Sequence, residues 1–326
     1  MRELDGLAQA LRALRPDVDR HVTRERVRRY LTALADAPAP STAASAMRVP
    51  ILRQMLEQDG AFEGRRLHLC GDFGNTGSAV ILTGSPDEAK PLWYFAHLDT
   101  ISYLIQPFDG ERYKLVPFCY HMVVDGVRAA RVYRYDLAQN TYAALTDGQL
   151  ESVSGTPFFR PAPDAVPLRA GDRVVPVSTY REDGATGHFT GHVDNAGGVA
   201  ALAVAAPVLA GAGVEAMLAL PDEEEGPPGS GNQVMGRGGT RIVNLLPVPD
   251  LAIIADVQQA GGDGASDSRG GVENVTRLGG GAVLAEFSSL ARGAVTPPHL
   301  YTLARHVADL LAGVGVRVQE SNNAYS

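Results

Sequence analysis

Cysteine is scarce in this sequence, which has Cys70 and Cys119 as the two cysteines in 326 residues. Two cysteines cannot form a disulfide framework or a zinc site built from cysteine thiolates. The N-terminal segment MRELDGLAQALRALRPDVDR has charges throughout and no apolar core, so it does not have the pattern of a secretory signal. We therefore expect a cytoplasmic protein.

The sequence also has no excess of positive charge and no long apolar run without a break. The formal net charge is −8, and lysine occurs only at positions 90 and 114. An acidic chain with no cluster of basic and aromatic residues is not expected to bind nucleic acid. The most apolar segment, residues 199–221, is broken by Pro207, by two glycines and by Glu215. This pattern predicts a buried helix followed by a buried strand, and we expect no membrane span.

The composition is that of a folded globular protein, with 45% hydrophobic and 20% charged residues. Residues 1–60 have the spacing of apolar residues that is typical of amphipathic helices, and the stretch APAPSTAAS (37–45) separates two such helices. Residues 66–82 predict two short strands around a Gly-Asn turn. Residues 91–100 predict a buried strand that ends in polar side chains.

The pattern changes between residues 102 and 186. Short runs of β-branched and aromatic residues alternate there with Gly, Pro and Asp turns, which is typical of a small all-β module. Residues 187–326 return to alternating helices and strands, which favours a mostly parallel or mixed sheet with helices on both faces. We predict an α/β domain made of residues 1–101 and 187–326, with a β domain of residues 102–186 inserted in it.

Acidic or imidazole side chains follow several of the predicted strands. They are His97 and Asp99, Asp194, Glu223 and Glu224, and Asp256. Ligands bind at the carboxyl ends of the strands in open α/β sheets, so these side chains are expected to meet. So many carboxylates repel one another unless a cation compensates them, whereas one histidine with several carboxylates is an ordinary ligand set for divalent metals. Any one of these residues, taken alone, could be structural.

The order of the motifs resembles that of the M42 family, the glutamyl aminopeptidase-like peptidases that use two metal ions. The motifs are D-x-G-N (72–75), A-H-L-D (96–99), G-D-R-V-V (171–175), V-D-N-A-G-G (193–198), E-E-E-G (223–226) and A-D-V-Q-Q-A-G (255–261). The match extends from about residue 70 to the end of the chain. It implies a phosphorylase/hydrolase-like fold of the zinc-peptidase type and the removal of N-terminal residues from peptides.

The resemblance also implies which residues bind metal. His97, Asp194 and Asp256 would hold one divalent ion, and Asp194 would bridge to a second ion that Glu224 also binds. Asp99 would orient the imidazole of His97. Zinc is the expected metal, with cobalt or manganese as alternatives, because oxygen and nitrogen ligands accept all three.

Three further expectations concern the residues beside these ligands. Glu223 would be the general base that takes a proton from the attacking water. Glu225 departs from the family, whose members commonly have an apolar residue there, and it is expected to face solvent or the ammonium group of the substrate. Related enzymes have a cis peptide at the position of Asp194 and Asn195, and we expect one here.

The last metal ligand of the family is a histidine near the C-terminus, and this sequence ends at residue 326 before the expected position. Either the sequence is truncated or the protein is a divergent member that lacks one imidazole; a truncated chain is the expectation. His299 and His306 lie in a predicted helix and are not expected to replace it. His188 and His192 have the spacing of a helical zinc pair, but their neighbours favour an extended segment.

Several family members form closed assemblies of many subunits, so the resemblance implies a homo-oligomer that acts on peptides or small amides. A non-catalytic or single-metal relative and a metal-dependent deacylase remain alternatives. A glycosidase that uses Glu223 and Glu224 is disfavoured, because adjacent residues at one strand end do not flank a sugar from both sides. A nucleotide enzyme is disfavoured because residues 226–236 lack the phosphate-loop lysine.

Overall fold

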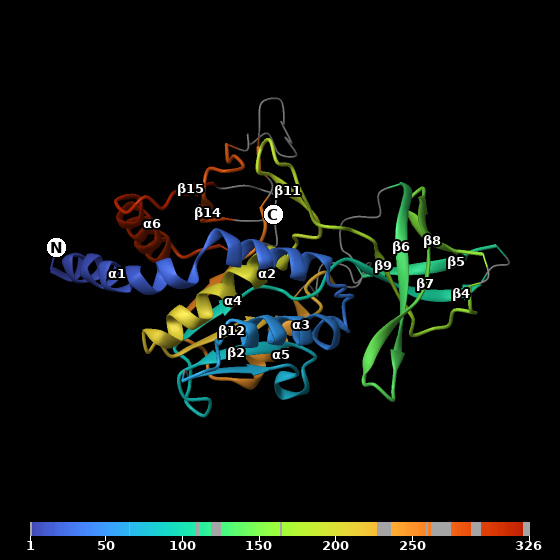
Figure 1. Cartoon of the computed structure of the whole chain (residues 1–326), viewed down its shortest axis with the longest axis horizontal. Coiled ribbons are helices and arrows are strands. Elements are labelled where there is room, and N and C mark those ends of the chain that lie inside the picture. The colour runs from blue at the N-terminus through green and yellow to red at the C-terminus, as the bar shows by residue number, and fades with distance from the viewer. Residues whose placement is uncertain are drawn as a thin grey trace. The chain divides into compact units, whose positions relative to one another are not determined.

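The computed structural model (Figure 1) describes most of the chain. Outside the description are residues 1, 65, 109–110, 119–124, 164, 227–235, 259, 262–274, 288–294 and 322–326, so Cys119 lies outside the described residues. Two compact units are present. The larger comprises residues 14–183 and 189–255, and the smaller comprises residues 1–13, 184–188 and 256–326.

A five-stranded mixed sheet lies at the centre of the larger unit. Its order is β1 (Leu67–Cys70), β2 (Ala79–Thr83), β12 (Ala216–Leu220), β3 (Leu92–Phe95) and β13 (Leu251–Ile254). The pairs β1–β2 and β2–β12 are antiparallel, whereas β12, β3 and β13 run parallel. The carboxyl ends of these three parallel strands therefore lie side by side at one edge of the sheet.

Helices cover both faces of this sheet (Figure 1). The helices α2 (Arg24–Asp36), α3 (Ala44–Gln58) and α4 (Ala196–Gly211) share a core with one face, and α5 (Arg237–Leu245) packs on the other. Side chains alternate along β12, so that Leu218 joins the first core while Met217 packs with Ile242 of α5. Full burial of such side chains stabilises the fold by about 1.5–3 kcal/mol each.

The apolar segment 199–221 is divided between α4 and β12, as the sequence predicts. α4 is hydrophobic all round and contacts α2 and the sheet, which is typical of a helix buried in a protein core. Among the described residues, no helix combines the length and the apolar character that a membrane crossing requires.

The predicted β module is a closed six-stranded barrel. The strands, in barrel order, are β4 (Ser102–Phe108), β5 (Tyr113–Phe118), β8 (Thr156–Pro161), β7 (Thr141–Val153), β6 (Gly126–Asp136) and β9 (Arg173–Pro176). Tyr103, Val132 and Phe159 are among the side chains that fill it. A short ribbon of β10 (Arg181–Glu182) and β11 (Phe189–Thr190) follows. The barrel matches the small inserted β domain, and the domain boundaries at residues 102 and 186 stay a prediction.

The smaller unit contains β14 (Ala282–Leu284), α6 (Pro298–Ala312) and β15 (Val318–Glu320), together with the first part of α1 (Arg2–His21). β14 and β15 pair in parallel with each other, whereas the sequence pattern suggested that they would join one large sheet. His299 and His306 lie on α6, as predicted. His188 and His192 lie in non-helical segments, also as predicted.

Candidate metal centre

The loop after β3 carries His97 and Asp99 into the interior. The N–H of Ala96 donates to the carbonyl of Ala219 at 3.1 Å, and the N–H of Leu98 donates to the carbonyl of Pro221 at 2.7 Å. These bonds continue the pairing of β3 with β12 beyond the strand ends. As a result both side chains are buried, with 4% of His97 and 0% of Asp99 exposed.

Asp194 and Asp256 are positioned through Asn195, the N-cap residue of α4. The side-chain amide of Asn195 donates to the carbonyl of Ala255 at 2.9 Å, and the N–H of Ala255 donates to the carbonyl of Phe95 at 2.8 Å. The start of α4 is thereby joined to the segment after β13, and Asp256 is the next residue in the chain. The peptide bond between Asp194 and Asn195 is cis, as predicted.

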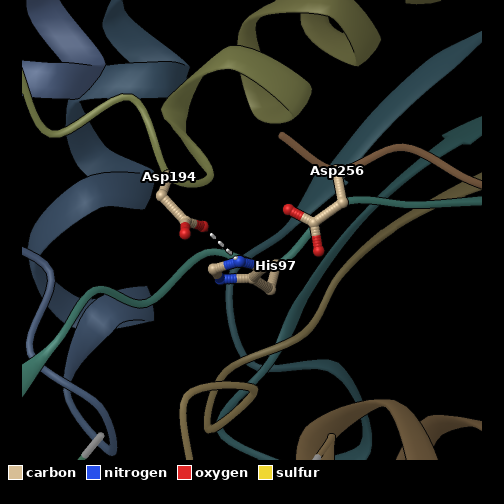
Figure 2. A group of neighbouring side chains, drawn as sticks. All are labelled: His97, Asp194 and Asp256. Carbon is tan, nitrogen blue, oxygen red and sulfur yellow. Dashed lines mark hydrogen bonds and ion pairs between the residues drawn. The ribbon is translucent and has the colours of Figure 1, made fainter. Parts of the chain in front are cut away.

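Figure 2 shows how His97, Asp194 and Asp256 converge. Each offers one ligand atom, and these atoms lie within 4.8 Å of one another. Nε2 of His97 is 2.9 Å from Oδ1 of Asp194 and 3.9 Å from Oε2 of Glu224. The structure therefore brings the predicted metal ligands close to one imidazole, and the assignment of each to a metal ion stays a prediction.

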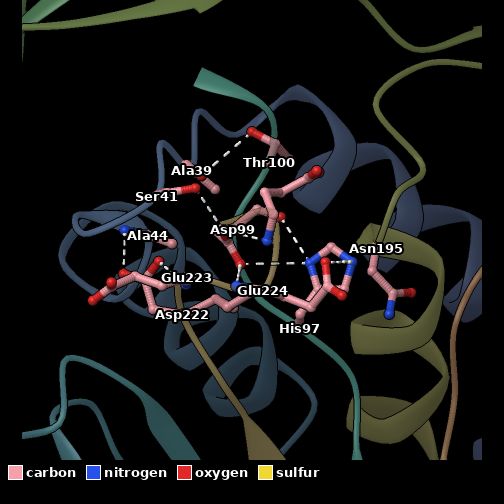
Figure 3. A network of polar contacts seen from close by, with 12 residues as sticks. Ala39, Ser41, Ala44, His97, Asp99, Thr100, Asn195, Asp222, Glu223 and Glu224 are labelled. Carbon is pink, nitrogen blue, oxygen red and sulfur yellow. Dashed lines mark hydrogen bonds and ion pairs between the residues drawn. The ribbon is translucent and has the colours of Figure 1, made fainter. Parts of the chain in front are cut away.

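Asp99 supports His97 from the other ring nitrogen (Figure 3). Nδ1 of His97 lies 3.1 Å from the carbonyl oxygen of Asp99 and 3.5 Å from its carboxylate. The same carboxylate accepts the N–H groups of Glu224 at 3.0 Å and Glu225 at 3.3 Å and the hydroxyl of Ser41 at 2.6 Å. Such a partner fixes the orientation of a metal-binding histidine and leaves Nε2 directed at the cluster.

Burial and neighbouring carboxylates shift the pKa values of several groups at the site. Burial, with the negative charge of Asp194, raises the pKa of Glu225 well above its usual range, and burial with the charge of Asp99 does the same for Asp222. Burial lowers the pKa of His97, but its hydrogen bonds to Asp194 and Asp99 outweigh this and hold the pKa well above the ordinary value. A divalent cation would displace that proton and compensate the carboxylates, so the residues fit a metal ion.

Glu223 is held by a different set of partners. Its Oε1 accepts a hydrogen bond from Arg241 at 2.6 Å, and its other oxygen pairs with Arg237, so both partners come from α5. Arg241 also donates to the carbonyl of Thr76 at 3.0 Å. The predicted general base is therefore engaged by two arginines, whereas Glu224 and Glu225 hydrogen-bond through their backbones to Asp99.

The segment between α2 and α3 and the first turns of α3 support the site, which the sequence pattern did not indicate. Ser41 binds Asp99, and the fully buried Arg48 donates to the carbonyl of Leu98 at 2.6 Å. Asp222 accepts the N–H groups of residues 42 and 44 at 3.0 and 3.1 Å (Figure 3). Two features of the sequence could have indicated this support. They are Arg48, an arginine buried within a helix, and Asp222, a fourth acid beside the three glutamates.

Comparison with protein-family models and with curated proteins gives no match. Solved structures do match. A TET aminopeptidase from the marine sediment archaeon Thaumarchaeota archaeon SCGC AB-539-E09 superposes with a TM-score of 0.67 at 17% identity, over 93% of this chain and 82% of that chain. The chain has the TET aminopeptidase fold.

Two further solved structures with the TET aminopeptidase fold also match this chain. The aminopeptidase APDkam598 from Desulfurococcus kamchatkensis gives a TM-score of 0.63 at 18% identity, over 92% of this chain and 81% of that chain. The TET1 peptidase of Pyrococcus horikoshii gives 0.63 at 15% identity, over 91% of this chain and 84% of that chain. The fold that the M42 resemblance implied is therefore confirmed.

Proposed function

We propose that the protein is a metal-dependent aminopeptidase that removes N-terminal residues from peptides. The observation that carries this proposal is the group of His97, Asp194 and Asp256, whose ligand atoms lie within 4.8 Å of one another. His97 and Asp256 follow the parallel strands β3 and β13, and Asp194 precedes α4. The TET aminopeptidase fold supports it, because the matched structures are described as aminopeptidases.

We infer that two divalent ions bind per subunit. Asp194 would bridge them, with His97 and Asp256 on one side and Glu224 on the other. One imidazole with several carboxylates suits zinc, and it also accepts cobalt or manganese. When bound, such ions lower the pKa of water towards neutrality and polarise the carbonyl that is attacked.

The protein's own residues orient the ligands and move the proton. Asp99 holds the ring of His97, and Ser41 and two backbone N–H groups hold Asp99. A glutamate must take the proton of the attacking water and pass it to the leaving amine. Glu223 is the residue that the family resemblance assigns to this step, and it would have to leave its arginine partners. Glu225 is the second candidate, because it lines the same pocket as Asp194.

Chelation tests the proposed function. The full chain is treated with a chelator, dialysed, and assayed on a panel of aminoacyl p-nitroanilides before and after Zn²⁺, Co²⁺ or Mn²⁺ is restored. We expect hydrolysis to require the added metal and to be lost in His97→Ala. Hydrolysis of N-acetylated substrates only would identify a deacylase, and a folded protein that binds no metal and cleaves neither class would be a non-catalytic relative.

A further inference from the structure

A pocket of about 430 Å³ opens beside the candidate metal centre. Asp194 and Glu225 line it from the α/β part, and Arg128 lines it from strand β6 of the barrel. The segments that join the two parts, around Ile101 and Val177, complete the lining. The volume lies within the range of about 300–1,000 Å³ that is typical of small-molecule sites.

The α/β part and the barrel contribute opposite charges to this pocket. The α/β part contributes two carboxylates, whereas Arg128 carries the one permanent positive charge among the described residues that line the pocket. The backbone fixes Arg128 at this place, because the N–H of Val177 donates to the carbonyl of Ala129 at 2.8 Å and Arg128 is paired with Leu150 on β7. Apolar side chains, among them Ile101 and Val193, lie along the same lining.

We propose that Arg128 binds the C-terminal carboxylate of the substrate, so that the substrates are short peptides with a free C-terminus. The inference rests on the proposed aminopeptidase function. A peptide of this class has a scissile bond for the metal centre beside Asp194, apolar side chains for the apolar lining, and a carboxylate at the other end. Arginine suits that carboxylate because its guanidinium donates two parallel charge-assisted hydrogen bonds.

Matched substrates test the proposal in the zinc-loaded full chain. Leucyl-alanine and leucyl-alanine amide differ only in the C-terminal charge, so the ratio of their kcat/KM values measures recognition of the carboxylate. We expect the free acid to be preferred by about ten- to a hundred-fold, the scale of a charged hydrogen bond. Arg128→Ala should abolish that preference, and Arg128→Lys should retain part of it. Arg131→Ala is the control, because Arg131 is on the same strand but pairs with Asp147.

A binding measurement separates this inference from the function on which it rests. Calorimetry with a leucyl-alanine analogue that has a reduced peptide bond, as free acid and as amide, needs no hydrolysis. Binding of the free acid that depends on Arg128 in a chain that cleaves nothing would support the pocket and reject the peptidase function. A free acid to amide ratio that is unchanged in Arg128→Ala, in either measurement, would overturn the inference.

Discussion

At the scale of single residues, Ser41 supports the candidate metal centre through Asp99. Its hydroxyl, completely buried, donates to Asp99 at 2.6 Å, and Asp99 in turn holds Nδ1 of His97. Removing a partner behind a metal-binding histidine typically weakens metal binding by about 10–100-fold. We expect Ser41→Ala to weaken Zn²⁺ binding by that factor, measured by competition with a chromophoric chelator.

The control for Ser41 lies four residues further along the chain, in the first turn of α3. Ser45 donates to the backbone carbonyl of Gly71 instead of to the site, so Ser45→Ala should leave Zn²⁺ affinity unchanged. Ser41→Thr keeps the hydroxyl and should restore most of the affinity. The absorption spectrum of the Co²⁺-loaded protein should change in Ser41→Ala, because the orientation of His97 changes. Zn²⁺ affinity in Ser41→Ala equal to that of the wild type would refute the role of Ser41.

The two candidate bases can be separated by single substitutions to glutamine. Replacing the true general base should lower kcat by about 10²–10⁴-fold while the metal content is retained. Glu223 is engaged by Arg237 and Arg241, whereas Glu225 lines the pocket with Asp194, so we expect the larger loss in Glu225→Gln. Kinetics on one p-nitroanilide together with elemental analysis checks this, and the larger loss in Glu223→Gln would restore the assignment from the family resemblance.

At the scale of elements, helix α5 holds the loop that follows β12. Arg241 contacts both Glu223 and the carbonyl of Thr76, so it joins that loop to the turn before β2. Loss of a partner from a buried carboxylate costs about 1–3 kcal/mol, and Arg241 is itself partly exposed. We expect Arg241→Ala to lower the free energy of unfolding by about 1–2 kcal/mol in urea denaturation.

Arg28 provides the matched control for that substitution. Its ion pair with Glu182 is exposed on the arginine side, with 62% of the Arg28 side chain accessible. Exposed pairs contribute about 0–1 kcal/mol. Equal destabilisation by Arg28→Ala and Arg241→Ala would show that α5 does not hold the loop through Arg241.

The strands and helices around the site could be predicted because each has a local pattern. The apolar run of β12 and the Ala-rich sequence of α4 predict these two elements, and the acids at residues 222–225 follow the end of β12. The partners of Glu223 and Asp99 could not be predicted in this way. Arg241 and Ser41 lie 18 and 58 positions away along the chain, and no local periodicity relates them to the site.

At the scale of the whole molecule, we predict that subunits assemble. The TET1 peptidase of Pyrococcus horikoshii is described as able to assemble into a tetrahedron or a large octahedral shell. In this chain, Val127, Leu137 and Val153 of the barrel part are 62, 83 and 52% exposed, and a contact between subunits would remove such apolar side chains from water. We expect a homo-oligomer whose contacts include the barrel.

Light scattering coupled to size-exclusion chromatography measures this directly. The wild type should have a mass of several times 34.5 kDa, the mass of one chain. Leu137→Asp should shift the mass towards that of one chain, while Asp87→Ala, a change on a turn of the α/β part, should not. A wild type that elutes with the mass of one chain would contradict the expected oligomer.

The central claim is that His97, Asp194 and Asp256 hold a divalent ion. Anomalous X-ray diffraction from Zn²⁺-loaded crystals, measured on both sides of the zinc absorption edge, tests it most directly. The account predicts an anomalous peak about 2.0–2.2 Å from Nε2 of His97 and from a carboxylate oxygen of Asp194 and of Asp256. Zinc peaks elsewhere on the protein, with none beside His97, would contradict the account.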